Sequence, residues 1–246
     1  MQQFWPQNKR AALSISFDDS RVSQWENGIP ILDEYGIKST FYVMPHVVEN
    51  HLDAWKSAAA NGHEIGNHTV THPCSGNFTF SRNKALEDYT LARMEEELRG
   101  ANEAIKVLLG IEPQTFAYPC GQTFVGRGKN TQSYVPLVAK RFLAGRGFNG
   151  ESANDPTFCD LAQLIGMPGD VQDFALLEKH LDKTLQDGNW LILAAHDVGT
   201  ERQSISMEAL RAIGEYTKMH PELWTDTVAN IASYIKQRRD TDCRVR

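Results

Sequence analysis

The chain has 246 residues, of which 41% are hydrophobic and 23% charged, and its formal net charge is −6 at pH 7. This composition is that of an ordinary globular protein, and the negative charge argues against nucleic acid or an anionic membrane as the main partner. No apolar run is long enough to cross a bilayer, so no membrane span is predicted.

The length favours a single domain, because α/β barrels of this size form one unit. We therefore expect one domain over residues 1–246, with its core at about residues 10–238. Residues 1–6 contain no charged region followed by an apolar stretch, so no signal peptide is predicted. The cytoplasm is the default location, and secretion stays open if a signal has been removed; the sequence gives no oligomeric state.

The four cysteines are Cys74, Cys120, Cys159 and Cys243. They lack Cys-x-x-Cys spacing, so neither a structural zinc cluster nor a thioredoxin-like motif is indicated. Four free thiols in a reducing compartment are the default expectation. If the protein is secreted, Cys74 and Cys120 could pair, because both follow motifs that carry the predicted chemistry.

The first half of the chain alternates predicted strands and helices. The strands cover residues 11–17, 39–44 and 63–68, and the helices cover 22–35 and 52–60. Asp18 and Asp19 follow the first strand, and His68 ends the third. Chemistry at the carboxyl ends of successive strands is typical of a parallel barrel or a doubly wound sheet.

Two carboxylates and two imidazoles form the predicted site. Adjacent carboxylates at a strand end are costly unless a cation lies beside them, and alone they are more often a turn or a helix cap. His68 and His72 are four residues apart, which places both on one face of a helix or tight turn. One carboxylate with two imidazoles suits a zinc-like ion, and the second carboxylate is then free to act as a base on water.

The second half of the chain continues the alternation. Strands are predicted over residues 114–117, 142–149, 161–168 and 190–195, and helices over 83–109, 135–141, 174–187, 207–219 and 228–238, with a frayed end from 237. The charge run at 95–97 is assigned to the wet face of a scaffold helix. His196 follows the last predicted strand, where an imidazole that titrates near neutral pH suits a general acid. About seven strand–helix units are predicted in total, which indicates an α/β fold, a distorted (β/α) barrel of about seven parallel strands.

Three of these stretches resemble the motifs of the polysaccharide deacetylases, the NodB homology family also known as carbohydrate esterase family 4. Ser16-Phe17-Asp18-Asp19-Ser20 resembles the family's Thr-Phe-Asp-Asp-Gly, His68-Thr69-Val70-Thr71-His72 matches His-Ser/Thr-x-x-His, and Ala194-Ala195-His196 resembles Leu-x-His. The resemblance implies that Asp19, His68 and His72 bind one divalent ion, with Zn²⁺ expected and Co²⁺, Mn²⁺ or Ni²⁺ as alternatives. It also implies Asp18 as base and His196 as acid. The family's partner aspartate for this histidine is not placed, Asp170 being the nearest candidate.

The third motif departs from the family's Arg-Pro-Pro-Tyr-Gly. Here the stretch is Phe116-Ala117-Tyr118-Pro119-Cys120-Gly121, which is nearer to the Phe-Ala-Tyr-Pro-x-Gly variant of some branches. The resemblance implies substrate or oxyanion contacts near Tyr118 and Cys120, the latter through its backbone N–H. Ala117 stands where the family has its arginine, and Arg146 is the candidate replacement; a solvent-facing Arg146 is the alternative.

The resemblance implies a metal-dependent hydrolase that removes acetyl groups from a carbohydrate, as an N-acetyl amide or an O-acetyl ester. An acetylated carbohydrate is the expected partner. Two alternatives stay open: hydrolysis of another non-peptide C–N bond, as in allantoin, and a catalytically silent sugar-binding domain. Changes at Ser20, Ala117, Cys120 and Ala194 motivate the silent domain, and the presence of all three ligands, base and acid argues against it.

Overall fold

The computed structural model describes residues 4–244. Its strands are β1 (Ala11–Phe17), β2 (Thr40–Val43), β3 (Glu64–Asn67), β4 (Thr115–Ala117), β5 (Phe124–Val125), β6 (Gln132–Ser133), β7 (Ala144–Arg146), β8 (Met167–Pro168), β9 (Trp190–Ala195), β10 (Asp197–Val198), β11 (Ser204–Ile205) and β12 (Leu223–Thr225). Its α-helices are α1 (Ile29–Glu34), α2 (Pro45–Asn50), α3 (Leu52–Ala60), α4 (Leu91–Leu109), α5 (Val135–Arg141), α6 (Phe174–Asp187), α7 (Met207–Met219) and α8 (Val228–Arg244).

The central sheet is parallel and follows the order β7-β4-β3-β2-β1-β9-β8. β12 pairs with the first half of β1, and the small pairs β10–β11 and β5–β6 lie outside this path. Leu164 bridges to β7 while Met167 pairs with β9, so the short segment 164–168 contacts both edges of the curled sheet. The predicted distorted α/β barrel of about seven parallel strands is therefore confirmed.

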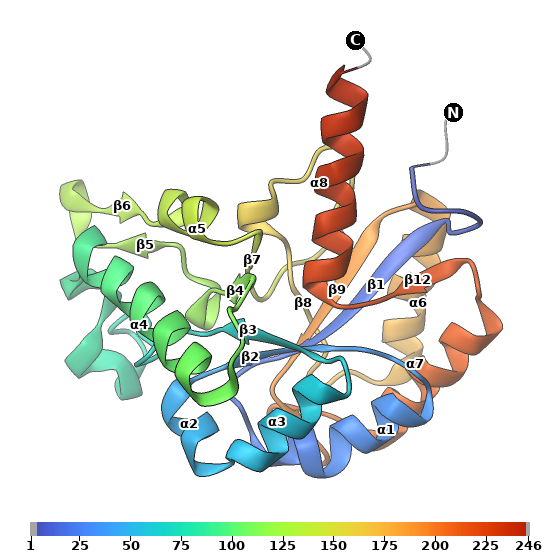
Figure 1. The fold of residues 1–246 in the computed structure, drawn as a ribbon, viewed down its shortest axis with the longest axis horizontal. Coiled ribbons are helices and arrows are strands. Elements are labelled where there is room, and N and C mark those ends of the chain that lie inside the picture. The colour runs from blue at the N-terminus through green and yellow to red at the C-terminus, as the bar shows by residue number, and fades with distance from the viewer. Residues whose placement is uncertain (1–3, 245–246) are drawn as a thin grey trace.

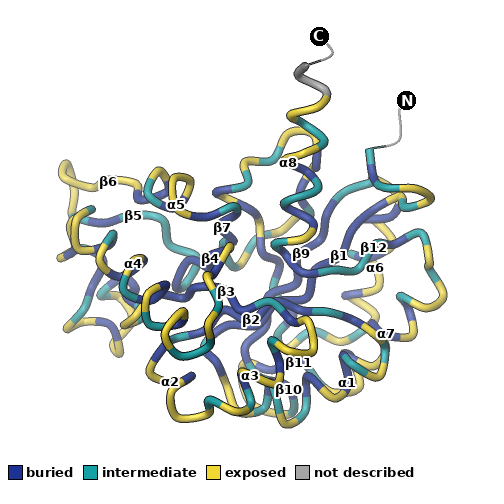
Figure 2. Tube along the Cα trace, viewed as in Figure 1, coloured by how far each residue is buried: buried dark blue, intermediate teal, exposed yellow. Residues whose placement is uncertain are grey.

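Helices surround the sheet on its outer side (Figure 1). The strands are the buried part of the chain, and the exposed residues lie mainly on the helices and loops, as Figure 2 shows. Every residue of β1 and β9 is buried, which is the pattern of parallel strands covered on both faces. Phe17 and Phe41 stack with their ring centroids 5.3 Å apart, joining β1 to β2 near the end that carries the site.

Several predicted boundaries differ from the structure. The strand predicted over 142–149 covers only β7, and the helix predicted over 22–35 is α1 preceded by a π-helical turn at Gln24–Gly28. α4 begins at Leu91 rather than residue 83, because the Thr90 side chain accepts a hydrogen bond from Arg93 N–H and caps the helix there. The strand predicted over 161–168 is only β8, preceded by a 3-10 turn at Leu161–Gln163. The end predicted to fray from residue 237 is helical as far as Arg244, and residues 245–246 lie outside the described range. Within residues 4–244, the structure contains no helix that is long and apolar enough to span a membrane.

Candidate active site

The side chains that could act in catalysis or bind a metal gather at the carboxyl ends of the parallel strands. They follow three different strands: Asp18 and Asp19 follow β1, His68 follows β3, and His196 follows β9. Because parallel strands end at one edge of a sheet, these residues line a single pocket of about 740 Å³. The sequence analysis predicted this grouping from the strand ends, and the structure brings the four together.

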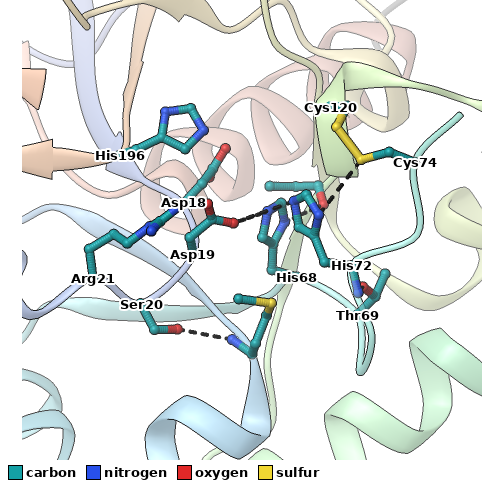
Figure 3. A network of polar contacts seen from close by, with 12 residues as sticks. Asp18, Asp19, Ser20, Arg21, His68, Thr69, His72, Cys74, Cys120 and His196 are labelled. Atoms are coloured by element: carbon teal, nitrogen blue, oxygen red, sulfur yellow. Dashed lines mark hydrogen bonds and ion pairs between the residues drawn. A yellow bond between two sulfur atoms is a disulfide. The ribbon is translucent and has the colours of Figure 1, made fainter. Parts of the chain in front are cut away.

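Asp19, His68 and His72 form a cluster of potential metal ligands. The Nε2 atoms of His68 and His72 lie 3.5 and 3.4 Å from Asp19 Oδ1. Two ligands at a tetrahedral angle around an ion with bonds of about 2.1 Å lie roughly 3.4 Å apart, so these separations fit one shared zinc-sized ion. Figure 3 shows the two imidazoles facing Asp19.

The hydrogen bonds around the cluster leave the ligand atoms free. His68 Nδ1 lies 2.9 Å from the carbonyl oxygen of Ala117, so it carries the proton and leaves the Nε2 lone pair directed at the cluster. Arg21 donates to Asp19 Oδ2 at 2.9 Å, which leaves Oδ1 for an ion. Burial and the neighbouring His68 lower the pKa of His72 to about 4, which keeps this imidazole neutral, the form that binds metals.

The Asp19 carboxylate is held ionised by its surroundings. Burial alone would raise the pKa of Asp19, but the neighbouring imidazoles of His68, His72 and His196 hold that pKa well below its ordinary value. His72 also lies close to the sulfurs of Cys74 and Cys120, yet these are joined in a disulfide and offer no thiolate. The donor set around Asp19 therefore fits one divalent ion.

Asp18 is paired with a buried arginine. Arg146, at the end of β7, is fully buried and donates from Nη2 to Asp18 Oδ1, whose side chain is 4% exposed. The guanidinium also donates to Gly147 O at 2.9 Å and lies over the Tyr42 ring at 4.9 Å. A buried carboxylate needs such a partner. The position predicted for Arg146 at the site is therefore the one observed, and the solvent-facing alternative is excluded.

His196 is oriented by Asp170. Its Nδ1 lies 2.6 Å from Asp170 Oδ2, and its backbone N–H donates to Asp170 Oδ1 at 3.0 Å. Burial alone would lower the pKa of His196, but the hydrogen bond to Asp170 and the charge of Asp18 outweigh it and raise that pKa. Asp170 was the nearest candidate for this role in the sequence, and the structure places it in contact with the ring.

Gln24 is a member of the site that sequence reasoning missed. Its Nε2 donates to the carbonyl oxygens of Asp18 at 2.6 Å and His196 at 2.7 Å, so one buried amide joins the ends of β1 and β9. Nothing in its sequence context distinguishes it from other polar residues of the helix predicted over 22–35. What identifies Gln24 is its pair of hydrogen bonds to the ends of β1 and β9, and these can be recognised only once the two strands are known to lie side by side.

The backbone at the end of β1 is strained. Asp19 and Ser20 have φ values of 71° and 56°, in the left-handed region that non-glycine residues rarely adopt. Ser20 stands where the family motif has glycine, and its Oγ accepts a hydrogen bond from Met44 N–H at 3.0 Å. Such strain persists only where the surroundings hold it, and it is concentrated at functional sites. The change at Ser20 therefore leaves the local conformation intact.

A disulfide joins Cys74 and Cys120 beside the cluster (Figure 3). The default expectation of four free thiols is thus wrong, because the loop after β3 and the turn after β4 bring these two cysteines together; Cys159 is free. Cys120 lines the pocket and has a φ of 54°. Among the residues that the structure describes, no acceptor is found for its backbone N–H, which fits the predicted oxyanion contact.

Tyr118 does not belong to the site. Its side chain is buried among Phe116 and Tyr134, and its hydroxyl donates to Ala162 O at 2.7 Å. The substrate contact predicted for this residue is corrected accordingly. The reason is the alternation of side chains along a strand, which turns Tyr118 towards the core.

Comparisons with known proteins show which family and fold the chain resembles. Residues 6–134 match the family model described as polysaccharide deacetylase. A gellan lyase from Bacillus sp is 24% identical over 96% of this chain and 10% of its own length. A chitooligosaccharide deacetylase from Rhizobium leguminosarum bv. trifolii is 33% identical over 37% of this chain and 38% of its own length. The chain thus spans well under half the length of either curated relative.

Two solved structures show the same fold at low sequence identity. One, from Mycobacterium smegmatis, is described as a polysaccharide deacetylase and has a TM-score of 0.70 at 16% identity, covering 96% of this chain and 93% of its own. The other, the PuuE allantoinase, has a TM-score of 0.68 at 16% identity, covering 94% and 92%. The family model matches more than half of the chain and agrees with the motifs and the fold. The chain therefore belongs to the polysaccharide deacetylase family.

Proposed function

We propose that the protein is a metal-dependent hydrolase that removes acetyl groups from a carbohydrate. One observation carries the proposal: a single pocket combines a cluster of three potential metal ligands with two oriented groups. These are the Asp18 carboxylate, which is paired with Arg146, and the His196 imidazole, which contacts Asp170. Asp19, His68 and His72 would hold the ion, with Zn²⁺ expected. A bound ion supplies Lewis acidity that polarises a carbonyl and acidifies water.

The remaining steps belong to side chains of this chain. Asp18 accepts the proton of the attacking water, and Arg146 fixes the orientation of its carboxylate. The backbone N–H of Cys120 stabilises the negative charge that develops on the acetyl oxygen. His196, protonated and held through Nδ1 by Asp170, donates a proton to the departing amine or alkoxide. The same groups serve an amide or an ester.

Acetate release is the test of this proposal. The panel contains N-acetylated oligosaccharides of increasing length, O-acetylated xylan and, as the non-carbohydrate alternative, allantoin with its own hydrolysis assay. We expect release from at least one acetylated sugar, and the preferred substrate decides between amide and ester. Hydrolysis of allantoin alone, or no turnover by the metal-loaded protein, would contradict it; the second result would favour the silent sugar-binding domain.

Two exposed phenylalanines support an extended saccharide substrate. Phe78 and Phe80 line the pocket, are 43% and 59% exposed, and have ring centroids 5.6 Å apart. Phe80 is 6.3 Å from the His72 ring, so the pair lies next to the metal cluster. A sugar ring presents a face of C–H groups, which the electron-rich face of an aromatic ring attracts. A small cyclic amide would leave this surface uncovered.

Replacing Phe80 with alanine is expected to lower kcat/KM for a long acetylated oligosaccharide by about fivefold, the size of one aromatic contact. The monosaccharide should lose much less, because it does not reach this ring. Phe158→Ala is the matched control, since Phe158 is 89% exposed and does not line the pocket. An equal loss for short and long substrates would contradict the stacking surface.

Asp170→Asn is expected to move the alkaline limb of the kcat–pH profile to lower pH. His196 must be protonated to donate, and its raised pKa keeps it protonated further into the alkaline range. An amide removes the charged hydrogen-bond partner, so the pKa of His196 falls and its protonated form is lost earlier as pH rises. Asp197→Asn is the control, because the Asp197 carboxylate accepts a hydrogen bond from Ser23 Oγ at 2.7 Å and is not the partner of the His196 ring. An alkaline limb that does not move would exclude His196 as the acid.

A further inference from the structure

Glu97 on α4 lies under the loop that carries His72. The sequence assigns Glu97 to the wet face with its neighbours, but the structure shows its side chain buried, with only 8% of the residue exposed, whereas Glu96 is exposed. Its Oε2 accepts from Val70 N–H and Thr71 N–H, each at 2.9 Å. Its Oε1 accepts from Thr71 Oγ1 at 2.7 Å and from Tyr89 OH at 3.0 Å. The prediction that Glu97 lies on the wet face of the helix is therefore wrong.

The loop between the two histidines depends on side chains for its backbone hydrogen bonds. It belongs to no helix or strand, and Thr69 and His72 have φ values of 64° and 53°. Thr69 N–H donates to Asn67 Oδ1 at 2.8 Å and His72 N–H to Thr69 Oγ1 at 2.9 Å, both contacts within a few residues. Strained residues of this kind persist only when other contacts hold them.

Glu97 supplies the anchor from outside the loop. The two remaining N–H groups between the histidines, those of Val70 and Thr71, both donate to its carboxylate, which is 26 and 27 residues away along the chain. Because α4 is a 19-residue helix packed on the sheet, the Glu97 carboxylate has a fixed position, and its hydrogen bonds hold the loop in place. Both oxygens are occupied by these donors, so Glu97 is not itself a ligand.

We propose that Glu97 is a positioning residue that holds the His68–His72 loop in the geometry needed to bind the metal. This inference rests on the proposed function, because it assumes that Asp19, His68 and His72 bind an ion. Removing a group that orients metal ligands typically weakens metal binding by about 10–100-fold. The role depends on a side chain long enough to contact the N–H groups of Val70 and Thr71, which we call its reach, and not on the charge of the carboxylate acting at the ion.

Three substitutions separate reach from charge. Glu97→Ala removes all four contacts, and Glu97→Asp keeps the charge on a side chain one carbon shorter, so that it falls short of the loop. Glu97→Gln keeps the length: its amide oxygen can accept from Val70 and Thr71, while its NH₂ faces the hydroxyls of Thr71 and Tyr89, which can reorient to accept. Glu96→Ala, one residue earlier on the same helix, is the matched control.

The measurement is the Zn²⁺ dissociation constant of each purified full-length variant, obtained by competition with a chromophoric chelator, together with thermal unfolding of the apo form. We expect binding at least tenfold weaker for Glu97→Ala and Glu97→Asp, within about threefold of wild type for Glu97→Gln, and unchanged for Glu96→Ala. Glu97→Asp also serves if the alanine variant does not fold.

The outcomes distinguish this inference from the proposed function. Tight Zn²⁺ binding by wild type with undiminished affinity in Glu97→Ala and Glu97→Asp would overturn the role of Glu97 and leave the metal site standing. Weakening in Glu97→Gln as large as in Glu97→Ala would show that charge matters and overturn the argument from reach. Wild-type protein that binds no Zn²⁺ would refute the metal site, and this inference with it.

Discussion

Asp18→Asn is expected to lower kcat by about 10²–10⁴-fold, the contribution of a positioned general base. The asparagine amide keeps the shape of the side chain and can still accept from Arg146, so the metal cluster is retained even though loss of the buried charge pair lowers the stability of the fold. Zn²⁺ binding should therefore be close to wild type. Kinetics of acetate release and metal content per chain, measured on the same preparation, check the two halves of this expectation.

Asp19→Ala is the contrast for Asp18→Asn. Asp19 is the carboxylate that faces both imidazoles, with Oδ1 at 3.5 and 3.4 Å from their Nε2 atoms. Its removal is expected to abolish both metal binding and turnover. The roles of the adjacent aspartates are thus separable in one experiment. Normal deacetylation by Asp18→Asn would exclude Asp18 as the base, and metal loss in Asp18→Asn would assign it to the ligand set.

Arg146→Met is expected to destabilise the protein by about 3–5 kcal/mol, because it leaves the buried carboxylate of Asp18 without its partner. The methionine fills part of the same volume, so the effect reports the lost charge more than a cavity. The catalytic rate should fall as well, since Asp18 is no longer held in one orientation. Urea denaturation gives the free energy of unfolding, and acetate release gives the rate.

Arg127→Met is the control for the buried pair. Arg127 pairs with Asp88 at 2.8 Å, and both side chains are more than half exposed. Surface pairs of this kind contribute at most about 1 kcal/mol, so this substitution should have little effect on stability. Equal stabilities of Arg146→Met and Arg127→Met would mean that the Arg146–Asp18 contact does not neutralise a buried charge.

Asp18, Asp19 and His196 could be placed from the sequence because they follow long, well-defined strands. β1 is a seven-residue apolar strand, so the position of Asp18 and Asp19 at its end needed no tertiary information. β9 has the same character and places His196 at the same edge. Parallel strand ends meet by topology, which is why separate motifs predicted one pocket.

Other parts of the site depend on contacts that no local pattern shows. Asp170 follows β8, which has only two residues, so no clear strand end marked its position. Glu97 lies in a run of three glutamates, and helical periodicity cannot tell which of them meets a loop from elsewhere in the chain. Tyr118 was placed at the site by its neighbours in the motif, and strand alternation turned it into the core. The disulfide needed the proximity of two loops.

Metal-dependent deacetylation is tested most directly by acetate release from the preferred acetylated sugar after chelation and after Zn²⁺ is restored. Activity should stop when the metal is removed and return with about one Zn²⁺ bound per chain. Undiminished release from metal-free protein would contradict the account, because the Asp19–His68–His72 cluster would then have no part in the reaction.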